Sequence, residues 1–91
     1  MTVSVRIPTI LRTYTGGTAV VSAMPGTLRE VIAGLDADYP GLGGRLLDDA
    51  GKLRRFVNVY VNDDDVRLAQ GLDTPVAAGG QISVIPAVAG G

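Results

Sequence analysis

The chain has 91 residues, enough for one small domain, and its 8 Lys+Arg against 9 Asp+Glu give a formal net charge of −1. It contains no histidine and no cysteine, which excludes the usual metal ligands, the commonest general base, every thiol nucleophile and a disulfide framework. The charge gives no nucleic-acid or membrane signature, and no leader or bilayer-length apolar run is evident. We therefore expect a cytoplasmic protein that binds small molecules or other proteins, and not a self-contained enzyme.

Alternating apolar residues at the start of the chain predict a strand over residues 3–7, which Pro8 closes. Turn-forming residues at 13–17 separate it from a second β-rich run at 18–23, so we expect the two strands to pair as a hairpin. The glycine pair in this turn is not interpreted as a phosphate loop, because a strand follows it where a phosphate loop needs a helix.

A helix is predicted after this hairpin. Thr27 followed by Glu30 forms a capping box that begins it, and Pro40 ends it near residue 39. Apolar residues at i, i+3, i+4 and i+7 give the helix one face that must pack on the sheet; they are Leu28, Val31, Ile32 and Leu35.

The second half of the chain predicts a connector and further strands. Residues 42–55 have a weak pattern with a short helical turn at 45–47, and 56–61 give the strongest strand signal, with Val57, Val59 and Val61 on one face. The aspartates at 48–49 are interpreted as solvated loop residues, not as a metal site. Those at 63–65 lack the ligand spacing of a calcium loop and are interpreted as a hairpin turn. An irregular crossing, a turn and a last strand are expected at 71–76, 78–80 and 81–85.

This order of elements predicts an α+β fold: a mixed sheet of four to five strands with one central helix packed on one face. The last strand leads into a small, uncharged tail, so we divide the chain into a domain at 1–85 and a tail at 86–91. Glycine has no Cβ, and six extended residues reach about 20 Å, so the tail can thread into a narrow site. The candidate reactive group is the carboxylate of Gly91, next to Gly90, at the end of Pro86, Ala87, Val88, Ala89.

Three segments of the chain together resemble those of one known family: Ile-Pro-Thr-Ile-Leu-Arg at 7–12, Phe-Val-Asn-Val-Tyr-Val-Asn-Asp at 56–63 and Ile-Pro-Ala-Val-Ala-Gly-Gly at 85–91. With the order of elements they resemble the ubiquitin-like β-grasp sulfur carriers of the ThiS/MoaD family, and within it the CysO-type carriers of cysteine biosynthesis. Molybdopterin-type tails carry a second proline where this chain has Ala87. The resemblance covers the whole chain and implies a β-grasp fold with an extended C-terminal tail.

The resemblance also implies a chemistry for the tail. An E1-like adenylyltransferase and sulfurtransferase of the MoeB/ThiF type would adenylate Gly91 using ATP and magnesium that the partner holds, so this chain itself is expected to bind no cofactor or metal. Sulfur then replaces AMP and leaves a thiocarboxylate, a nucleophilic sulfur on a protein handle. The implied acceptor is a pyridoxal-phosphate-dependent cysteine synthase or a thiazole-synthase-like enzyme. The sequence also leaves open products other than cysteine, such as thiosugars. A zinc metalloprotease would trim the product from the tail.

Partner recognition is expected on the sheet face opposite the helix. We expect Phe56, Tyr60 and Ile85 to point outward there and to bind partners together with the tail from Pro86 to Ala89. An alternative function is a ubiquitin-like modifier joined through Gly91 to lysines of target proteins, although the single Lys52 would serve self-linked chains poorly. A third is a β-grasp binding module whose tail is inert.

Overall fold

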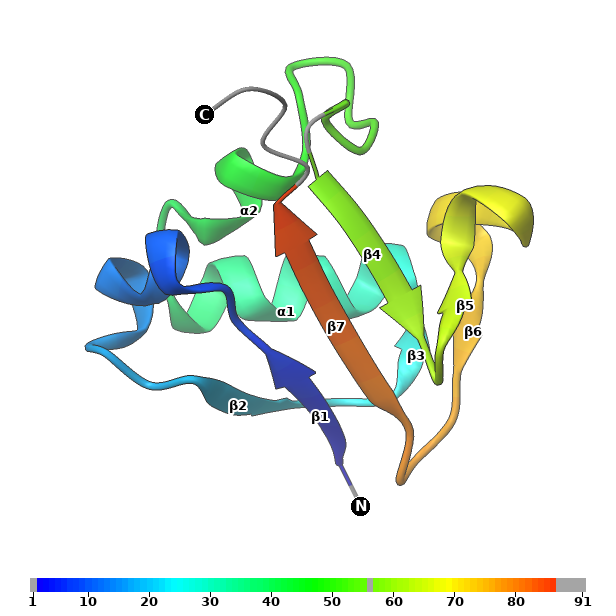
Figure 1. The fold of residues 1–91 in the computed structure, drawn as a ribbon, viewed down its shortest axis with the longest axis horizontal. Coiled ribbons are helices and arrows are strands. Elements are labelled where there is room, and N and C mark those ends of the chain that lie inside the picture. Colours follow the sequence, from blue (N-terminus) through cyan, green and yellow to red (C-terminus); the bar gives the residue numbers. More distant parts are fainter. Residues whose placement is uncertain (1, 56, 87–91) are drawn as a thin grey trace.

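A computed structural model of the chain describes residues 2–55 and 57–86, and its main feature is one mixed sheet (Figure 1). β1 and β7 are parallel neighbours at its centre, and the other neighbouring pairs are antiparallel. A second, two-stranded sheet joins β3 (Gly26–Thr27) to β6 (Pro75–Val76). The predicted β-grasp, ubiquitin-like fold is confirmed, with five strands in the order β2 (Val20–Ala23), β1 (Val3–Arg6), β7 (Gln81–Pro86), β4 (Val57–Val61), β5 (Asp64–Asp65).

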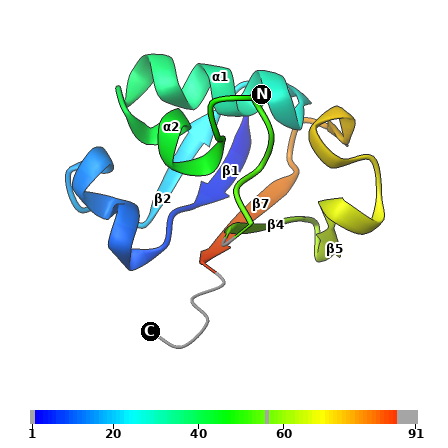
Figure 2. The ribbon, with the colours of Figure 1, turned by 90° about the horizontal axis from the view of Figure 1, so that it is seen from above.

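Helix α1 (Leu28–Asp38) lies across one face of this sheet (Figure 2). It begins at the predicted capping box: the backbone N–H of Glu30 donates to Thr27 Oγ1 at 3.3 Å, and Glu30 Oε1 accepts from the Thr27 N–H at 2.9 Å. All four predicted apolar residues are at most 2% exposed. They belong to one core with the inward-facing strand residues, which include Val5, Val59, Ile82 and Val84.

The connection between β1 and β2 is longer than the predicted hairpin. The two strands pair as expected, with Val5 opposite Val21, but a 3-10 helix, η1 (Thr9–Thr15), lies between them. The N–H of Leu11 donates to the carbonyl of Pro8 at 2.9 Å, and Gly16 ends the segment with φ +68°. A 3-10 helix has no apolar period like that of a strand or an α-helix, so the pattern gave no signal for it.

Helix α2 (Leu42–Leu46) buries Leu42 and Leu46 in the core; it begins three residues before the short turn predicted at 45–47 and ends at Leu46. The carboxylate of Asp36 in α1 positions it, because Asp36 Oδ1 accepts the N–H groups of Gly41 at 3.2 Å and Gly43 at 3.0 Å. A Cβ on Gly43 would lie 2.8 Å from the Cβ of Asp36. Gly43 is therefore a packing requirement that lets α2 approach α1.

The aspartate-rich segment after β4 is a tight hairpin turn, as predicted. Asn62 and Asp63 have φ of 51° and 76°, the two positive values that a two-residue turn between antiparallel strands requires. Two 3-10 helices, η2 (Val66–Leu68) and η3 (Gly71–Asp73), then lead the chain to β6. Within residues 2–55 and 57–86, no acidic cluster is arranged to hold a metal ion, and no helix is long and apolar enough to cross a bilayer.

The capping box predicts a pH-dependent contribution to stability. The N–H and hydroxyl of Thr27 both donate to the Glu30 carboxylate and lower its pKa from the ordinary value of 4.5. The contribution of ionised Glu30 is therefore complete above that ordinary value and is lost as the pH falls through the lowered pKa. We expect Glu30→Gln to lower the free energy of unfolding at about pH 7 and to differ much less from the wild type at about pH 3.

Urea unfolding at the two pH values measures this difference, and Asp49→Asn, in an exposed loop, is the control for a lost carboxylate. Thr27→Ala removes the acceptor of the helix N-cap and should lower the free energy of unfolding by about 1 kcal/mol at neutral pH. A gap between Glu30→Gln and the wild type that is the same at both pH values would contradict the assignment.

Candidate functional site

β7 carries the chain from the centre of the sheet to Pro86, the last residue that the structure describes. Pro86 lies opposite Val57 of β4, so it is the final residue of the strand, one position later than the strand end predicted at 85. A proline fits here because β1 pairs with β7 only over residues 81–83, and no strand on that side uses the missing N–H. The position from which the tail begins is thus fixed by the sheet.

The predicted reactive and tail residues lie outside the described residues. They are Ala87, Val88, Ala89, Gly90 and Gly91, and the same holds for Phe56 of the predicted partner surface. Their roles therefore stay predictions, and the geometry of the site comes from the body around Pro86.

The sheet face opposite α1 presents two of the predicted partner residues. Tyr60 is half-buried and lies opposite Ser83, while Ile85 is 47% exposed and lies opposite Asn58. These positions are diagonal neighbours on adjacent strands, within reach of long side chains. The structure confirms that both residues point away from the helix, whereas the buried valines of β4 point toward it. We call the pair Tyr60 and Ile85 the outer patch.

Two open hollows of about 320 Å³ flank Pro86, one on each side of the strand end. The first runs between η1, α2 and the strands, with Leu11, Tyr14, Arg45, Val57, Val84 and Pro86 in its wall. The second lies beside the outer patch and is lined by Arg6, Pro8, Ile10, Arg12, Ile85 and Pro86, among others. Their size is at the lower limit of ligand pockets, which suits a few side chains of a docked protein.

Element η1 supplies residues of this region that the sequence analysis did not assign to the site. Ile10 is 62% exposed at the rim of both hollows. Across the first hollow, Arg45 Nε donates a 2.7 Å hydrogen bond to Tyr14 Oη, and its guanidinium carbon lies 5.8 Å from the centre of the tyrosine ring. This contact joins η1 to α2. The segment at 7–12 was recognised as part of a family resemblance, but its pattern does not indicate that it borders the end of β7.

The chemistry of the lining favours binding over catalysis. Hydroxyls, guanidinium groups and apolar carbons line the two hollows, and among the described residues neither contains a carboxylate. A mixed sheet with a helix on one face and exposed apolar side chains on the other defines a ubiquitin-like β-grasp domain.

The chain belongs to the ThiS family, whose model matches residues 5–91. It is 55% identical to the sulfur carrier protein CysO of Mycobacterium tuberculosis over 93 aligned residues that cover 100% of both chains. It is also 42% identical over 65 residues to small archaeal modifier protein 3 of Haloferax volcanii, covering 71% of this chain and 70% of that protein. The chain is therefore a small carrier of the sulfur carrier family and not a catalyst.

Solved structures agree with this assignment. The crystal structure of M. tuberculosis CysO matches with a TM-score of 0.90 at 53% identity, covering 94% of this chain and 99% of that one. The CysO of Amycolatopsis orientalis, crystallised as a BexX/CysO complex, matches with a TM-score of 0.92 at 48% identity, covering 98% and 99%. SAMP1 of H. volcanii, at 23% identity and a TM-score of 0.81, shares the fold.

Proposed function

We propose that this chain carries sulfur as a thiocarboxylate on Gly91 for the biosynthesis of sulfur-containing metabolites, cysteine foremost. The observation that carries the proposal is the 55% identity to CysO over the whole of both chains. It is supported by the position of β7, whose last residue, Pro86, sets the start of the tail at an edge of the body with hollows on both sides.

The chemistry begins with activation of the terminal carboxylate. A carboxylate is a poor electrophile, because a nucleophile that attacks it must expel an oxide. In the proposed first step, an oxygen of Gly91 attacks the α-phosphorus of ATP on an E1-like partner and releases pyrophosphate. Hydrosulfide bound by the partner then attacks the acyl carbon, AMP leaves with the bonding pair, and loss of a proton leaves the thiocarboxylate on Gly91. ATP and magnesium belong to the partner in this scheme.

The acceptor of the sulfur is a second partner. In the cysteine pathway it would be a pyridoxal-phosphate-dependent cysteine synthase, whose bound aminoacrylate takes the thiocarboxylate sulfur at its β-carbon, and a zinc metalloprotease would trim the product from the tail. The relative that was crystallised in complex with BexX supports the view that such a carrier docks on a protein partner. A cytoplasmic location, where such enzymes meet the carrier, belongs to this proposal.

The body and the tail have separate tasks in this proposal. Five residues beyond Pro86 extend at most about 17 Å, so Gly91 reaches an active site only when the body has docked beside its entrance. The outer patch is the natural docking surface because Ile85 is exposed directly before the start of the tail. Docking buries apolar area, and the tail then threads into the partner.

Intact-protein mass spectrometry provides the direct test. We expect incubation with a MoeB/ThiF-type enzyme, ATP and a sulfur source to replace one oxygen by sulfur, and the mass gain should map to the C-terminal peptide. Amidation of Gly91 blocks the carboxylate and should abolish the mass gain. Truncation before Gly90 should also abolish the mass gain and should leave the fold intact. Sulfur uptake by the amidated chain would disprove the proposal.

The outer patch makes a second prediction about the same reaction. Tyr60→Asp and Ile85→Asp place a charge on the docking surface and should lower kcat/KM for activation by about tenfold or more. Met24→Asp is the matched control, because Met24 is 73% exposed on the loop between β2 and β3, away from Pro86. Stability should change by about 0.5 kcal/mol or less for the exposed sites, which chemical denaturation checks. Equal activation of all three variants and the wild type would contradict the docking role.

A second candidate function is protein modification through Gly91, which the likeness to small archaeal modifier protein 3 favours. The same activated carboxyl would then be attacked by the amine of a target lysine, giving an isopeptide bond and releasing the activating group. Expression of a tagged chain in its source cells separates the two functions. A ladder of larger tagged bands that disappears without Gly91 supports modification, and one small band carrying sulfur supports the carrier.

A further inference from the structure

Arginines surround the start of the tail. Arg6 and Arg12 line the hollow beside the outer patch, and Arg45 lines the hollow on the other side of Pro86. No described residue with a carboxylate lines either hollow. We call these three residues the arginine collar.

The collar charges are not neutralised inside the described part of the chain. Arg12 Nε donates to the carbonyl of Ile7 at 3.1 Å and Arg45 Nε donates to Tyr14 Oη, which fix the two side chains without cancelling their charge. Arg6 is exposed on the outer face of β1. The ion pair within residues 2–55 and 57–86 joins Arg29 to Asp73 at 3.4 Å, and it involves no member of the collar.

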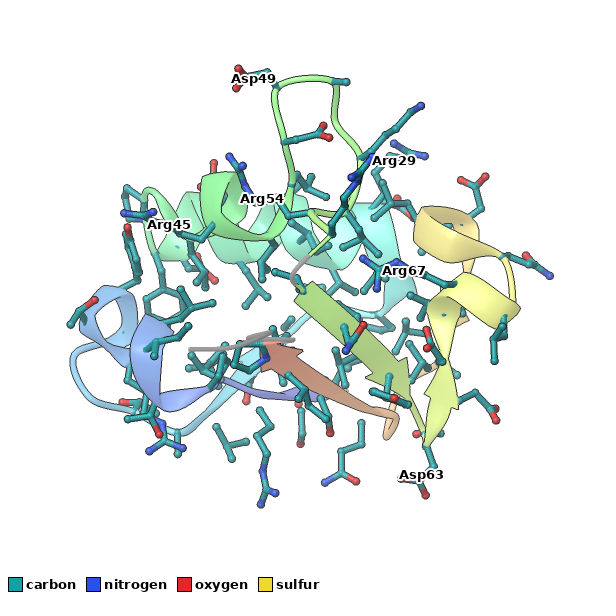
Figure 3. The ribbon with its side chains drawn as sticks, turned by 45° about the horizontal axis from the view of Figure 1, so that its top comes forward. Arg29, Arg45, Asp49, Arg54, Asp63 and Arg67 are labelled. Atoms are coloured by element: carbon teal, nitrogen blue, oxygen red, sulfur yellow. The ribbon has the colours of Figure 1, made fainter. Side chains whose placement is uncertain are left out.

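The opposite end of the sheet is acidic. β4 starts at Val57, opposite Pro86, and ends at Val61 beside the turn into Asp64, so its length separates the collar from the acidic hairpin. In Figure 3, Arg45 and Asp63 lie on opposite sides of the molecule. Asp49 projects from the connector loop, which lines a different hollow next to α1 and α2. A hollow at the acidic end is bordered by three carboxylates, those of Asp63, Asp64 and Asp65.

We propose that the proteins which receive the tail present acidic side chains around the entrance of the tail channel, and that the arginine collar docks against them. The inference rests on the proposed function, because it assumes that the tail enters a partner. Burying Arg6, Arg12 and Arg45 at such an entrance without counter-charges would be costly, so a partner that covers the two hollows must supply carboxylates.

The charge separation also orients the encounter. A basic tail end and an acidic far end turn the carrier so that its tail approaches an acidic entrance first, which raises the association rate at low ionic strength. The same separation disfavours a polyanion as the partner, because the net charge is −1 and the acidic hairpin repels an extended negative surface. An acidic protein surface is therefore the occupant that these charges fit.

The experiment measures binding to BexX of A. orientalis, the protein with which a CysO 48% identical to this chain was crystallised. Stopped-flow association is recorded for the full chain at about 20 mM and about 300 mM salt, where screening differs strongly. We expect Arg6→Glu to slow association by about tenfold at the low salt and by much less at the high salt. Arg29→Glu changes the net charge by the same amount but lies on α1, and its association rate should stay within about twofold of that of the wild type.

A second pair of variants separates charge from structure. Arg45→Gln should slow association, and Arg45→Lys should restore most of the rate, because lysine keeps the charge although it changes the contact with Tyr14. Ile85→Ser should weaken binding by speeding dissociation without changing the salt dependence. Circular dichroism verifies that each variant is folded.

Several results would contradict the proposed docking role of the arginine collar. They are an equal effect of Arg6→Glu and Arg29→Glu, a wild-type association rate independent of salt, an absence of wild-type binding to BexX, or equally tight binding to a single-stranded DNA probe. The failure of the proposed function has a different signature. In that case Gly91 would gain no sulfur in the mass experiment, while association with BexX would still depend on salt and on Arg6.

Discussion

The register of β7 is the constraint on which the rest of the structure depends. Ile82 and Val84 are 1% and 4% exposed under α1, whereas Ile85 on the alternate face is 47% exposed. A slip of one residue would bury Ser83 and Ile85 in their place and expose the two core residues. Because β1 and β4 hold β7 from both sides, Pro86 has one position in the sheet, and the start of the tail is determined by core packing.

Helix α1 gives the sheet two unlike faces. Its four apolar residues pack against the inner face, so the outer face and the rim around Pro86 are the surfaces that remain open to a partner. The rim is built by elements that the helix layer positions: α2 is held by Asp36 of α1, and Arg45 of α2 holds Tyr14 of η1. The hydrogen bonds of the segment that follows α1 therefore shape the first hollow beside Pro86.

The sequence predicted the parts of the fold in which one pattern repeats. Alternation in β1, β4 and β7 and the capping box with its apolar face in α1 are local signals, and the structure follows each of them. The sequence could not indicate η1 or the extent of α2, because both depend on contacts between distant segments, such as Asp36 with Gly43. The hollows beside Pro86 combine residues from four separate segments of the chain, and no spacing in the sequence indicates that these segments meet.

The composition of the chain also could not show where its charges lie on the surface. The net charge of −1 excluded a basic surface only on average, because basic residues near Pro86 and acidic residues after Val61 cancel in the sum. The sheet separates the two ends of β4, and the nearly neutral chain therefore has a basic end and an acidic end. Gly91 lies five residues beyond Pro86, up to about 17 Å away along the extended chain. With the tail extended into a partner, the arginines can therefore act only on how the body docks, and the chemistry at the terminal carbonyl must depend on groups of the partner.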